Sequence, residues 1–254
     1  MGRRMTVIFL LPAYNEAENL GPLLEEICTA MEHAALAYRV IVVDDGSTDD
    51  TYAVAQEYGK RLPILLEQNM PNEGLASALR KGLRKALEIA ASDDVIITMD
   101  ADNTHKPQQV PEMLAGLRRG ADIVIASRYR AGAEIHGLTA GRKLLSRGAG
   151  LLFQACYPIH GARDYTCGYR AYRAGLLREA VKLYGESFVS EQGFSCMIDA
   201  LLKLHKLGAR VTEIPLVLRY DLKKGESKMR VGRTIRQTLV LLLKRRLNIG
   251  ILRP

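Results

Sequence analysis

The sequence has no tryptophan, few other aromatic residues and only four cysteines, Cys28, Cys156, Cys167 and Cys196, among its 254 residues. No two of these cysteines stand at the Cys-x-x-Cys spacing that redox and zinc sites use. Isolated cysteines are typical of buried free thiols in a reducing compartment. The sequence therefore predicts neither a disulfide framework nor a zinc site.

Long apolar runs are also absent. The longest cover residues 7–11 and 239–243, whereas roughly 18 apolar residues are needed to span a bilayer. The apolar stretch near the N-terminus is too short for a signal peptide, and it runs into Pro12 rather than into a cleavage site. We therefore expect a cytoplasmic protein that is not secreted and does not cross a membrane.

Two signatures of nucleotide-binding proteins are missing. No Gly-x-Gly-x-x-Gly follows the first apolar run, which disfavours a dinucleotide-dependent oxidoreductase. The sequence also lacks Gly-x-x-x-x-Gly-Lys-Ser/Thr, which disfavours a P-loop hydrolase.

Acidic residues are scarce in the second part of the chain. The formal net charge is +8 overall, but residues 1–120 carry −6 and residues 121–254 carry +14. This asymmetry indicates a polyanionic or phosphate-bearing partner. Nucleic acid, an anionic membrane and a phosphorylated substrate all fit, so charge does not choose among them.

What the chain does have is a series of strand-helix units. Short apolar runs rich in Val and Ile predict buried parallel strands at residues 6–11, 39–43, 64–66, 95–99 and 123–126. Helical patterns cover residues 48–58, 75–91 and 107–118, and another begins near Asn15, which with Glu18 resembles a capping box. Such alternation predicts an α/β fold with a mainly parallel sheet and helices on both faces.

The pattern is looser after Arg128. We expect a glycine-containing loop at 132–141, helices at 142–157 and 191–207, strands at 166–172 and 210–214, and a polar loop at 221–230. An amphipathic, basic helix is expected at 231–247. The sequence shows no clear linker and no internal repeat. We therefore expect a single catalytic domain over residues 1–230, followed by the C-terminal helix and tail at 231–254.

Polar motifs follow three of the predicted strands. They are Pro-Ala-Tyr-Asn-Glu at 12–16, Asp-Asp-Gly-Ser-Thr-Asp at 44–49 and Asp-Ala-Asp at 100–102. Each alone is compatible with an ordinary turn or helix cap. Because the carboxyl ends of parallel strands share one edge of a sheet, where α/β proteins bind ligands, the three together predict a binding site.

Asp100 and Asp102 are alternate residues of an extended segment, so both carboxylates can reach one hard cation. Without a cation the two charges would repel each other. The pair therefore predicts a Mg²⁺ or Mn²⁺ site, and a metal there could neutralise a departing nucleoside diphosphate.

These motifs, with Ser-Arg-Tyr at 127–129, resemble glycosyltransferase family 2, whose members invert at the anomeric carbon and have a GT-A fold. Further motifs resemble the dolichol-phosphate (polyprenol-phosphate) mannosyltransferase branch: Arg-Lys-Leu-Leu-Ser-Arg-Gly-Ala at 142–149, Cys-Gly-Tyr-Arg-Ala-Tyr-Arg at 167–173 and Gly-Glu-Ser-Lys at 225–228. The resemblance covers roughly residues 5–230. It implies a nucleotide-sugar-binding half at 1–126 and an acceptor-binding half at 127–230.

The resemblance also implies roles for single residues. Base and ribose would be held by Pro12, Tyr14, Glu16, Val43 and Asp45. Metal and diphosphate would be held by Asp100 and Asp102, with the Ala101 backbone nearby. Arg128 and Lys228 would contact the phosphates of both donor and acceptor. Arg147 would contact the acceptor phosphate as well. The catalytic residues would be Asp102 and Arg128.

Two positions depart from the family pattern. Thr104 stands where a glutamine is often a further metal contact, and Leu222 stands where an arginine is common. Arg219 or Lys223 could take the place of that arginine.

The implied activity is transfer of one sugar from a nucleotide-sugar to a polyprenyl phosphate. Mannose from GDP-mannose is the leading donor, and another hexose stays open. A phosphate monoester is already largely dianionic near neutral pH and needs cations rather than a general base, which fits the basic second half. The alternative is a hydroxyl acceptor on a glycan, with Glu191 or Asp199 as base. A processive synthase is excluded because its Gln-x-x-Arg-Trp signature needs tryptophan, and the acidic strand ends argue against a nucleic-acid partner.

A polyprenyl acceptor lies in a bilayer, so the enzyme must reach a membrane surface. The helix expected at 231–247 combines an apolar stripe with basic residues and suits anionic lipid at the cytoplasmic face. Packing of this helix on the domain, or a separate membrane-anchoring subunit, are the alternatives.

Overall fold

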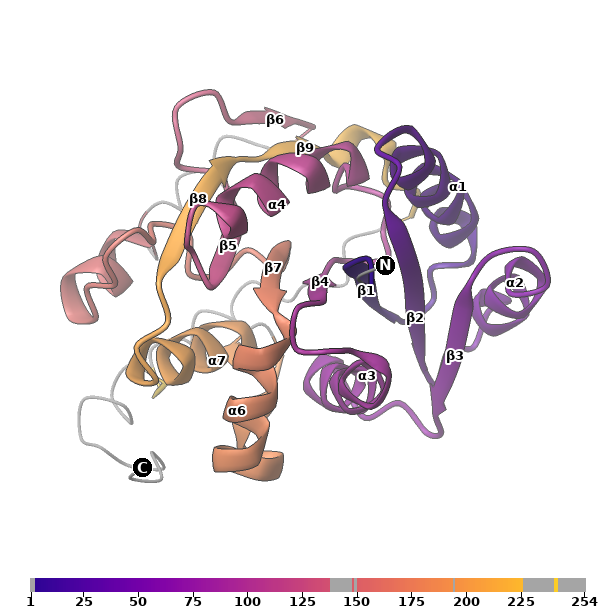
Figure 1. Cartoon of the computed structure of the whole chain (residues 1–254). Helices are drawn as coiled ribbons and strands as arrows, with labels where there is room; N and C mark the ends of the chain where they lie inside the picture. Colours follow the sequence, from indigo (N-terminus) through magenta and orange to yellow (C-terminus); the bar gives the residue numbers. More distant parts are fainter. Residues whose placement is uncertain (1–2, 138–147, 149, 194, 226–239, 242–254) are drawn as a thin grey trace.

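A computed structural model describes residues 3–137, 148, 150–193, 195–225 and 240–241. Its centre is a sheet of seven strands in the order β3-β2-β1-β4-β7-β5-β8, shown in Figure 1. The strands are β1 (Thr6–Ala13), β2 (Ala37–Asp45), β3 (Ile64–Asn69), β4 (Val95–Thr98), β5 (Ile123–Ser127), β7 (Arg170–Arg173) and β8 (Val211–Pro215). All neighbours pair in parallel except β7, which is antiparallel to both β4 and β5. The predicted mainly parallel sheet is therefore confirmed.

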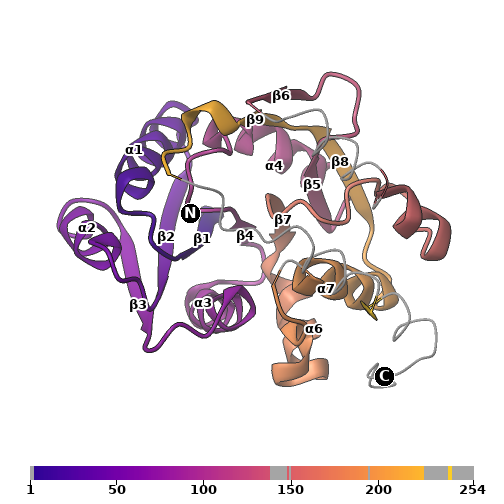
Figure 2. The same cartoon turned by 180° about the vertical axis from the view of Figure 1, so that it is seen from behind.

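Helices cover both faces of this sheet. They are α1 (Ala17–His33), α2 (Thr51–Tyr58), α3 (Leu75–Ile89), α4 (Val110–Arg118), α6 (Ala174–Tyr184) and α7 (Ser195–Lys206), and residues 150–156 are also helical. Figures 1 and 2 show α1 and α4 over one face and α3, α6 and α7 over the other. The inner strands β1, β4 and β5 are largely buried on both sides for this reason, which is why they read as continuous apolar runs.

The contact of α3 with the sheet is close because of one glycine. A Cβ atom at Gly82 would lie 2.0 Å from Leu10 Cδ1 and 2.9 Å from Val43 Cγ2. Any side chain at this position would push α3 away from β1 and β2. Because α3 begins directly after the loop at 70–74, Gly82 also fixes where that loop meets the sheet edge.

Two short strands outside the sheet were not expected. β6 (Glu134–His136) pairs in parallel with β9 (Val217–Arg219), and the 3₁₀ turn η3 (Tyr220–Leu222) follows β9. β6 lies inside the expected glycine-containing loop. Helix α6 was also missed.

Several expected boundaries are wrong. The strand expected at 166–172 begins only at Arg170, and the helix expected from residue 191 begins at Ser195. Residues 107–109 form a 3₁₀ turn before α4. The capping box is wrong as well: α1 is preceded by Glu16, which makes no side-chain cap hydrogen bond, and Asn15 has a positive φ of 53°.

Part of the prediction lies outside the described residues. This holds for residues 142–147 and 149 of the helix expected at 142–157, whose described residues 150–156 are helical as expected, for residues 226–230 of the polar loop, and for the helix expected at 231–247 apart from Val240 and Leu241. Within the part of the chain that is described, no helix combines the length and apolar character needed to cross a membrane.

Candidate active site

The three polar motifs meet at one edge of the sheet. β1 lies between β2 and β4 and runs parallel to both, so the segments that follow these strands emerge side by side. The sheet order changes direction here, because β2 and β3 extend to one side of β1 and β4 to the other. Such a switch point is the usual ligand crevice of an open α/β sheet.

Hydrogen bonds lock the first motif to the second. The Asn15 backbone N–H donates to Ser47 Oγ at 2.9 Å, and the Thr48 backbone N–H donates back to Asn15 Oδ1 at 2.8 Å. The Glu16 backbone N–H donates to Thr51 Oγ1 at 2.7 Å. Tyr14 lies on the same turn and remains 38% exposed. The turn residues thus build a fixed rim that presents the tyrosine at the sheet edge.

The second motif organises the loop that leads into α3. Asp45 is buried and accepts hydrogen bonds from Asn69 Nδ2 at 2.8 Å and from the backbone N–H groups of Glu73 and Gly74 at 3.1 and 2.8 Å. Val43 is fully buried within β2, so only its backbone can face a ligand. Pro12, beside Val43 in the sheet, is partly exposed.

Asp102 is clamped at both carboxylate oxygens. Oδ1 accepts from Thr104 Oγ1 at 2.7 Å and from the Thr104 backbone N–H at 3.2 Å. Oδ2 accepts from the Lys223 ammonium at 2.7 Å. The Thr104 hydroxyl therefore orients Asp102. Of the two residues considered in place of the missing arginine, Lys223 reaches the site, while Arg219 pairs with Asp221 at 2.8 Å.

Asp100 faces a different neighbour. It is partly exposed, and a Cβ atom at Gly168 would lie 3.4 Å from its Oδ1. The glycine of the Cys-Gly-Tyr motif thus brings the 165–168 segment against the carboxylate. Ala101, between the two aspartates, is buried.

The two aspartates differ in pKa. Burial raises the pKa of Asp100, and the Asp102 charge adds to this rise. Burial also acts to raise the pKa of Asp102, but the charges of Lys223 and His105, with the hydrogen bonds from Lys223 and Thr104, outweigh it and the pKa is lowered. The pKa of Lys223 is raised, because the Asp102 carboxylate outweighs the opposing effect of burial. Asp102 and Lys223 therefore form a charged pair.

The donor set fits a hard divalent cation. Mg²⁺ is commonly held by one or two carboxylates and completed by substrate phosphates and water. Asp100 and Asp102 supply such carboxylates, and a cationic group already stands at Asp102 Oδ2 in the form of Lys223. Among the described residues no cluster of three or more His, Cys, Asp or Glu side chains forms a closed metal site. The described residues therefore offer an open site with two carboxylates, Asp100 and Asp102.

Arg128 is held by a residue that the sequence did not point to. Its Nε and Nη2 donate to the two oxygens of Asp164 at 2.8 and 2.6 Å, and Nη2 also contacts Thr166 Oγ1. Asp164 is fully buried and Arg128 keeps 20% of its side chain exposed. Burial alone would raise the pKa of Asp164, but the Arg128 charge and hydrogen bonds lower it below its usual range.

The segment that carries Asp164 is itself tightly held. Glu213 Oε1 accepts from the backbone N–H groups of Arg163 and Asp164 at 2.6 and 2.7 Å. The fully buried Arg170 donates to the carbonyls of Tyr165, Cys167 and Met197 at 2.7–2.8 Å. These bonds fix the wall of the site that faces Asp100.

Asn19 fixes the segment that carries Lys223. Asn19 Nδ2 donates to Glu16 Oε2 at 2.7 Å and to the Lys224 carbonyl at 3.0 Å, while the Lys224 backbone N–H donates to Asn19 Oδ1 at 2.9 Å. The sequence did not point to a role for Asn19, because a single asparagine within a helix belongs to no recognisable motif. It connects the first motif to the segment after η3.

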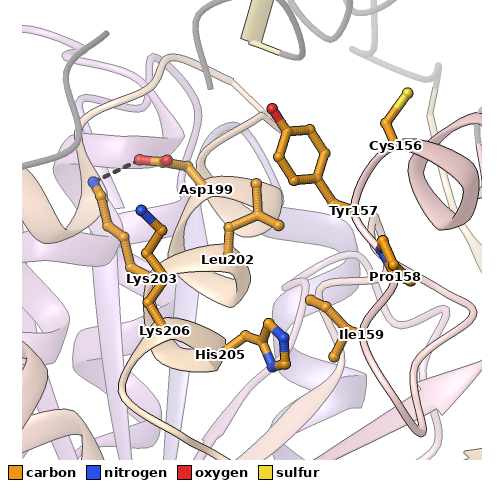
Figure 3. Close-up of a pocket in the computed structure, with 9 residues that line it drawn as sticks. All are labelled: Cys156, Tyr157, Pro158, Ile159, Asp199, Leu202, Lys203, His205 and Lys206. Carbon is orange, nitrogen blue, oxygen red and sulfur yellow. Dashed lines mark hydrogen bonds and ion pairs between the residues drawn. The ribbon is translucent and has the colours of Figure 1, made fainter. Parts of the chain in front are cut away.

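The residues considered as a base for a hydroxyl acceptor lie elsewhere. Asp199, on α7, is fully buried and paired with Lys203 at 2.6 Å. Figure 3 shows this pair beside a cavity of about 200 Å³ between α7 and residues 156–159. None of the strand-end side chains lines this cavity. Glu191 is partly exposed and precedes α7.

Two predicted phosphate contacts, Arg147 and Lys228, lie outside the described residues. The described site thus consists of the three strand-end motifs, Arg128 with Asp164, and Lys223 with the segment that Asn19 holds.

Known proteins resemble the chain along most of its length. The profile of Glycosyl transferase family 2 matches residues 8–180. The dolichol-phosphate mannosyltransferase of Pyrococcus furiosus is 34% identical over 91% of this chain, which spans 61% of that protein. The undecaprenyl-phosphate mannosyltransferase of Micrococcus luteus is 34% identical over 90% of this chain and 89% of its own length. The polyprenol monophosphomannose synthase of Mycolicibacterium smegmatis is 33% identical over 91% of this chain and 83% of its own length.

Solved structures share the fold. Glucosyl-3-phosphoglycerate synthase from Mycobacterium tuberculosis, in complex with Mn²⁺, UDP and phosphoglyceric acid, superposes with a TM-score of 0.66 at 21% identity, covering 97% of this chain and 79% of that one. Mannosyl-3-phosphoglycerate synthase from Rubrobacter xylanophilus superposes with a TM-score of 0.63 at 22% identity, covering 96% of this chain and 74% of that one. The GT-A-like α/β fold and the family resemblance inferred from the motifs are confirmed, and the chain belongs to glycosyl transferase family 2.

Proposed function

We propose that this protein transfers one sugar from a nucleotide-sugar to a polyprenyl phosphate, with mannose from GDP-mannose as the leading donor. The observation that carries the proposal is the similarity to three relatives named for mannosyl transfer to dolichol, undecaprenol or polyprenol phosphate, at 33–34% identity over 90% or more of this chain. The strand-end site supports it independently, because its carboxylates and cations suit a diphosphate donor.

In this proposal the donor lies along the edge formed by β1, β2 and β4. Base and ribose are held by Pro12, Tyr14, Glu16, Val43 and Asp45. Asp100 and Asp102 hold Mg²⁺ or Mn²⁺, with the Ala101 backbone beside the diphosphate. When bound, the metal supplies positive charge that stabilises the departing diphosphate. The neighbours that contain Mn²⁺ support this donor arrangement.

The acceptor phosphate needs no general base. One of its oxygens forms a bond to the anomeric carbon while the bond from that carbon to the donor diphosphate breaks, and no proton has to move. Attack in line with the leaving group inverts the anomeric centre. The chain's own task is to hold two anionic groups close together, and Arg128, Arg147 and Lys228 are the proposed cations for this task. Asp164 keeps the Arg128 guanidinium in a fixed orientation while it contacts phosphate.

A hydroxyl acceptor is less well supported by the site. A general base must reach the proton that it removes, whereas Asp199 is fully buried and already bound to Lys203. Glu191 is therefore the remaining candidate for the general base of a hydroxyl acceptor.

The membrane contact is also a proposal. We assign it to the basic C-terminal helix expected at residues 231–247, acting at the cytoplasmic face, with a separate anchoring subunit as the alternative. Each basic residue near an anionic surface contributes about 1 kcal/mol to binding. Binding to anionic vesicles should therefore fall with salt, and fall further when Lys244, Arg245 and Arg246 are all changed to Gln. If the protein does not bind anionic vesicles even at low salt, the C-terminal helix is not the contact.

The proposed activity is tested by incubating the protein with Mg²⁺, a short polyprenyl phosphate and radiolabelled GDP-mannose or UDP-glucose in parallel. We expect label in the lipid extract, most of it from GDP-mannose. A lipid product from UDP-glucose alone would correct the donor. Absence of lipid product from any nucleotide-sugar would overturn the proposal.

A further inference from the structure

Lys223 occupies the side of Asp102 on which the proposed metal must bind. Its ammonium lies 2.7 Å from Asp102 Oδ2, and the two side chains are only 10% and 12% exposed. We propose that Lys223 is an internal counter-cation that neutralises Asp102 before the metal binds and then turns to the donor diphosphate. This inference rests on the proposed metal and donor sites.

The two oxygens of Asp102 are not equivalent. Oδ1 accepts two hydrogen bonds from Thr104, one from the hydroxyl and one from the backbone N–H. Oδ2 is bound by Lys223. Because the two Thr104 donors lie in the same buried turn and already occupy Oδ1, Oδ2 is the oxygen left for a metal. A dication and an ammonium repel each other when both approach one oxygen, so the metal and Lys223 compete for Asp102.

The backbone around Lys223 is fixed, so the exchange needs only its side chain. The next residue, Lys224, is hydrogen-bonded through its N–H and carbonyl to Asn19. The Arg219 backbone N–H donates to the Thr104 carbonyl at 2.8 Å, which connects the start of this segment to the turn that carries Asp102. Lysine suits such a role, because its ammonium is a compact charge on a flexible four-carbon stem.

The position of Lys223 in the chain supports the second half of the proposal. Leu222 stands where the family resemblance would place an arginine, and Lys223 is the neighbouring cation that reaches the site. A donor diphosphate bound to a metal on Asp100 and Asp102 would offer Lys223 a new anionic partner within reach of its stem. Lys223 is thus a positioning residue that couples metal binding to donor binding.

This coupling has a defined sign. Free metal must displace Lys223 and therefore binds weakly on its own, whereas a nucleoside diphosphate gives the displaced ammonium a partner. Linkage requires the effect to be reciprocal. Removing the ammonium should then strengthen binding of metal alone and weaken binding of the nucleotide in the presence of metal.

The first experiment titrates Mn²⁺ by electron paramagnetic resonance into wild-type protein and Lys223→Met, without and with GDP. We expect Lys223→Met to bind Mn²⁺ alone about 5- to 150-fold more tightly, the usual range for coupling between two sites, and to bind GDP with Mn²⁺ more weakly. Lys224→Met is the matched control, because it removes the adjacent charge from an exposed side chain. Equal Mn²⁺ affinity in Lys223→Met and the wild type, or no Mn²⁺ binding by either, would overturn the proposal.

The second experiment follows Lys223 in the unmodified protein, so it does not depend on the folding of a variant. Amine acetylation is mapped by mass spectrometry on the apo protein, with Mn²⁺ alone, and with Mn²⁺ and GDP. We expect Lys223 to be protected in the apo protein, labelled with Mn²⁺ alone, and protected again with Mn²⁺ and GDP. Lys224 should be labelled in all three states. Protection of Lys223 with Mn²⁺ alone would mean a permanent ion pair and contradict the proposal. Neither experiment involves an acceptor, so a failure of the proposed lipid transfer is distinguished from a failure here.

Discussion

The guanidinium of Arg128 and the carboxylate of Asp164 form a two-pronged ion pair, with Nε and Nη2 donating at 2.8 and 2.6 Å. The carboxylate also accepts from the Arg128 backbone N–H at 3.1 Å. Asp164 therefore fixes both the backbone and the side chain of Arg128 at the end of β5. If Arg128 contacts a phosphate as we propose, it would do so in one orientation, because Asp164 orders its side chain before binding.

Asp164→Ala should destabilise the protein strongly. Removal of one partner from a buried ion pair leaves an uncompensated charge and typically costs about 3–5 kcal/mol. The free energy of unfolding, measured by urea denaturation at neutral pH, checks this. Asp122→Ala is a suitable control, because Asp122 pairs with Arg210 and Arg173 near the surface, where ion pairs contribute about 0–1 kcal/mol. A loss no larger than that of the control would contradict the importance of the buried pair.

The same pair should make stability depend on pH in acid. The pKa of Asp164 is lower in the folded protein than its unfolded value of about 3.9. A carboxyl group with a lowered folded pKa contributes stability that is fully present above the unfolded pKa and is lost as the pH falls through the folded pKa. Wild-type stability should therefore fall below about pH 4 more steeply than that of Asp164→Asn, which has no proton to gain. Parallel curves of unfolding free energy against pH for the two proteins would refute this expectation.

Thr104 should act on the metal site through Asp102. Loss of a group that orients a metal ligand typically costs about 10- to 100-fold in metal affinity or activity. Thr104→Val removes the hydroxyl that binds Asp102 Oδ1 and should weaken Mn²⁺ binding in the presence of GDP by this factor. Thr104→Ser keeps the hydroxyl and should stay within a few-fold of the wild type. Equal effects of the two substitutions would mean that the hydroxyl does not orient the carboxylate.

The sequence predicted the sheet well where burial alone decides the pattern. β1, β2 and β4 are covered on both faces, so their apolar runs are continuous, and the expected and observed ends differ by at most two residues. β6 has only three residues and exists because β9 pairs with it, more than 80 positions further along the chain. Contacts between such distant segments leave no local periodic pattern.

The same limit applies to the site. The strand-end motifs could be predicted because parallel strands bring their carboxyl ends together. Asp164 lies 36 residues from Arg128, Lys223 lies 121 from Asp102, and Asn19 lies 205 from Lys224. The capping box failed for a related reason: the Asn15 side chain binds the second motif at Thr48, so it is not available to cap α1.

We propose that the acceptor's phosphate, and not a hydroxyl group, receives the sugar. To distinguish the two, the protein is given the same GDP-mannose and Mg²⁺ with either a short polyprenyl phosphate or the matching polyprenol, and the product and its anomeric configuration are determined. We expect a mannosyl phosphate product of inverted configuration from the polyprenyl phosphate, and no product from the polyprenol. Transfer to the polyprenol hydroxyl, or a product from the phosphate that retains the donor configuration, would contradict it.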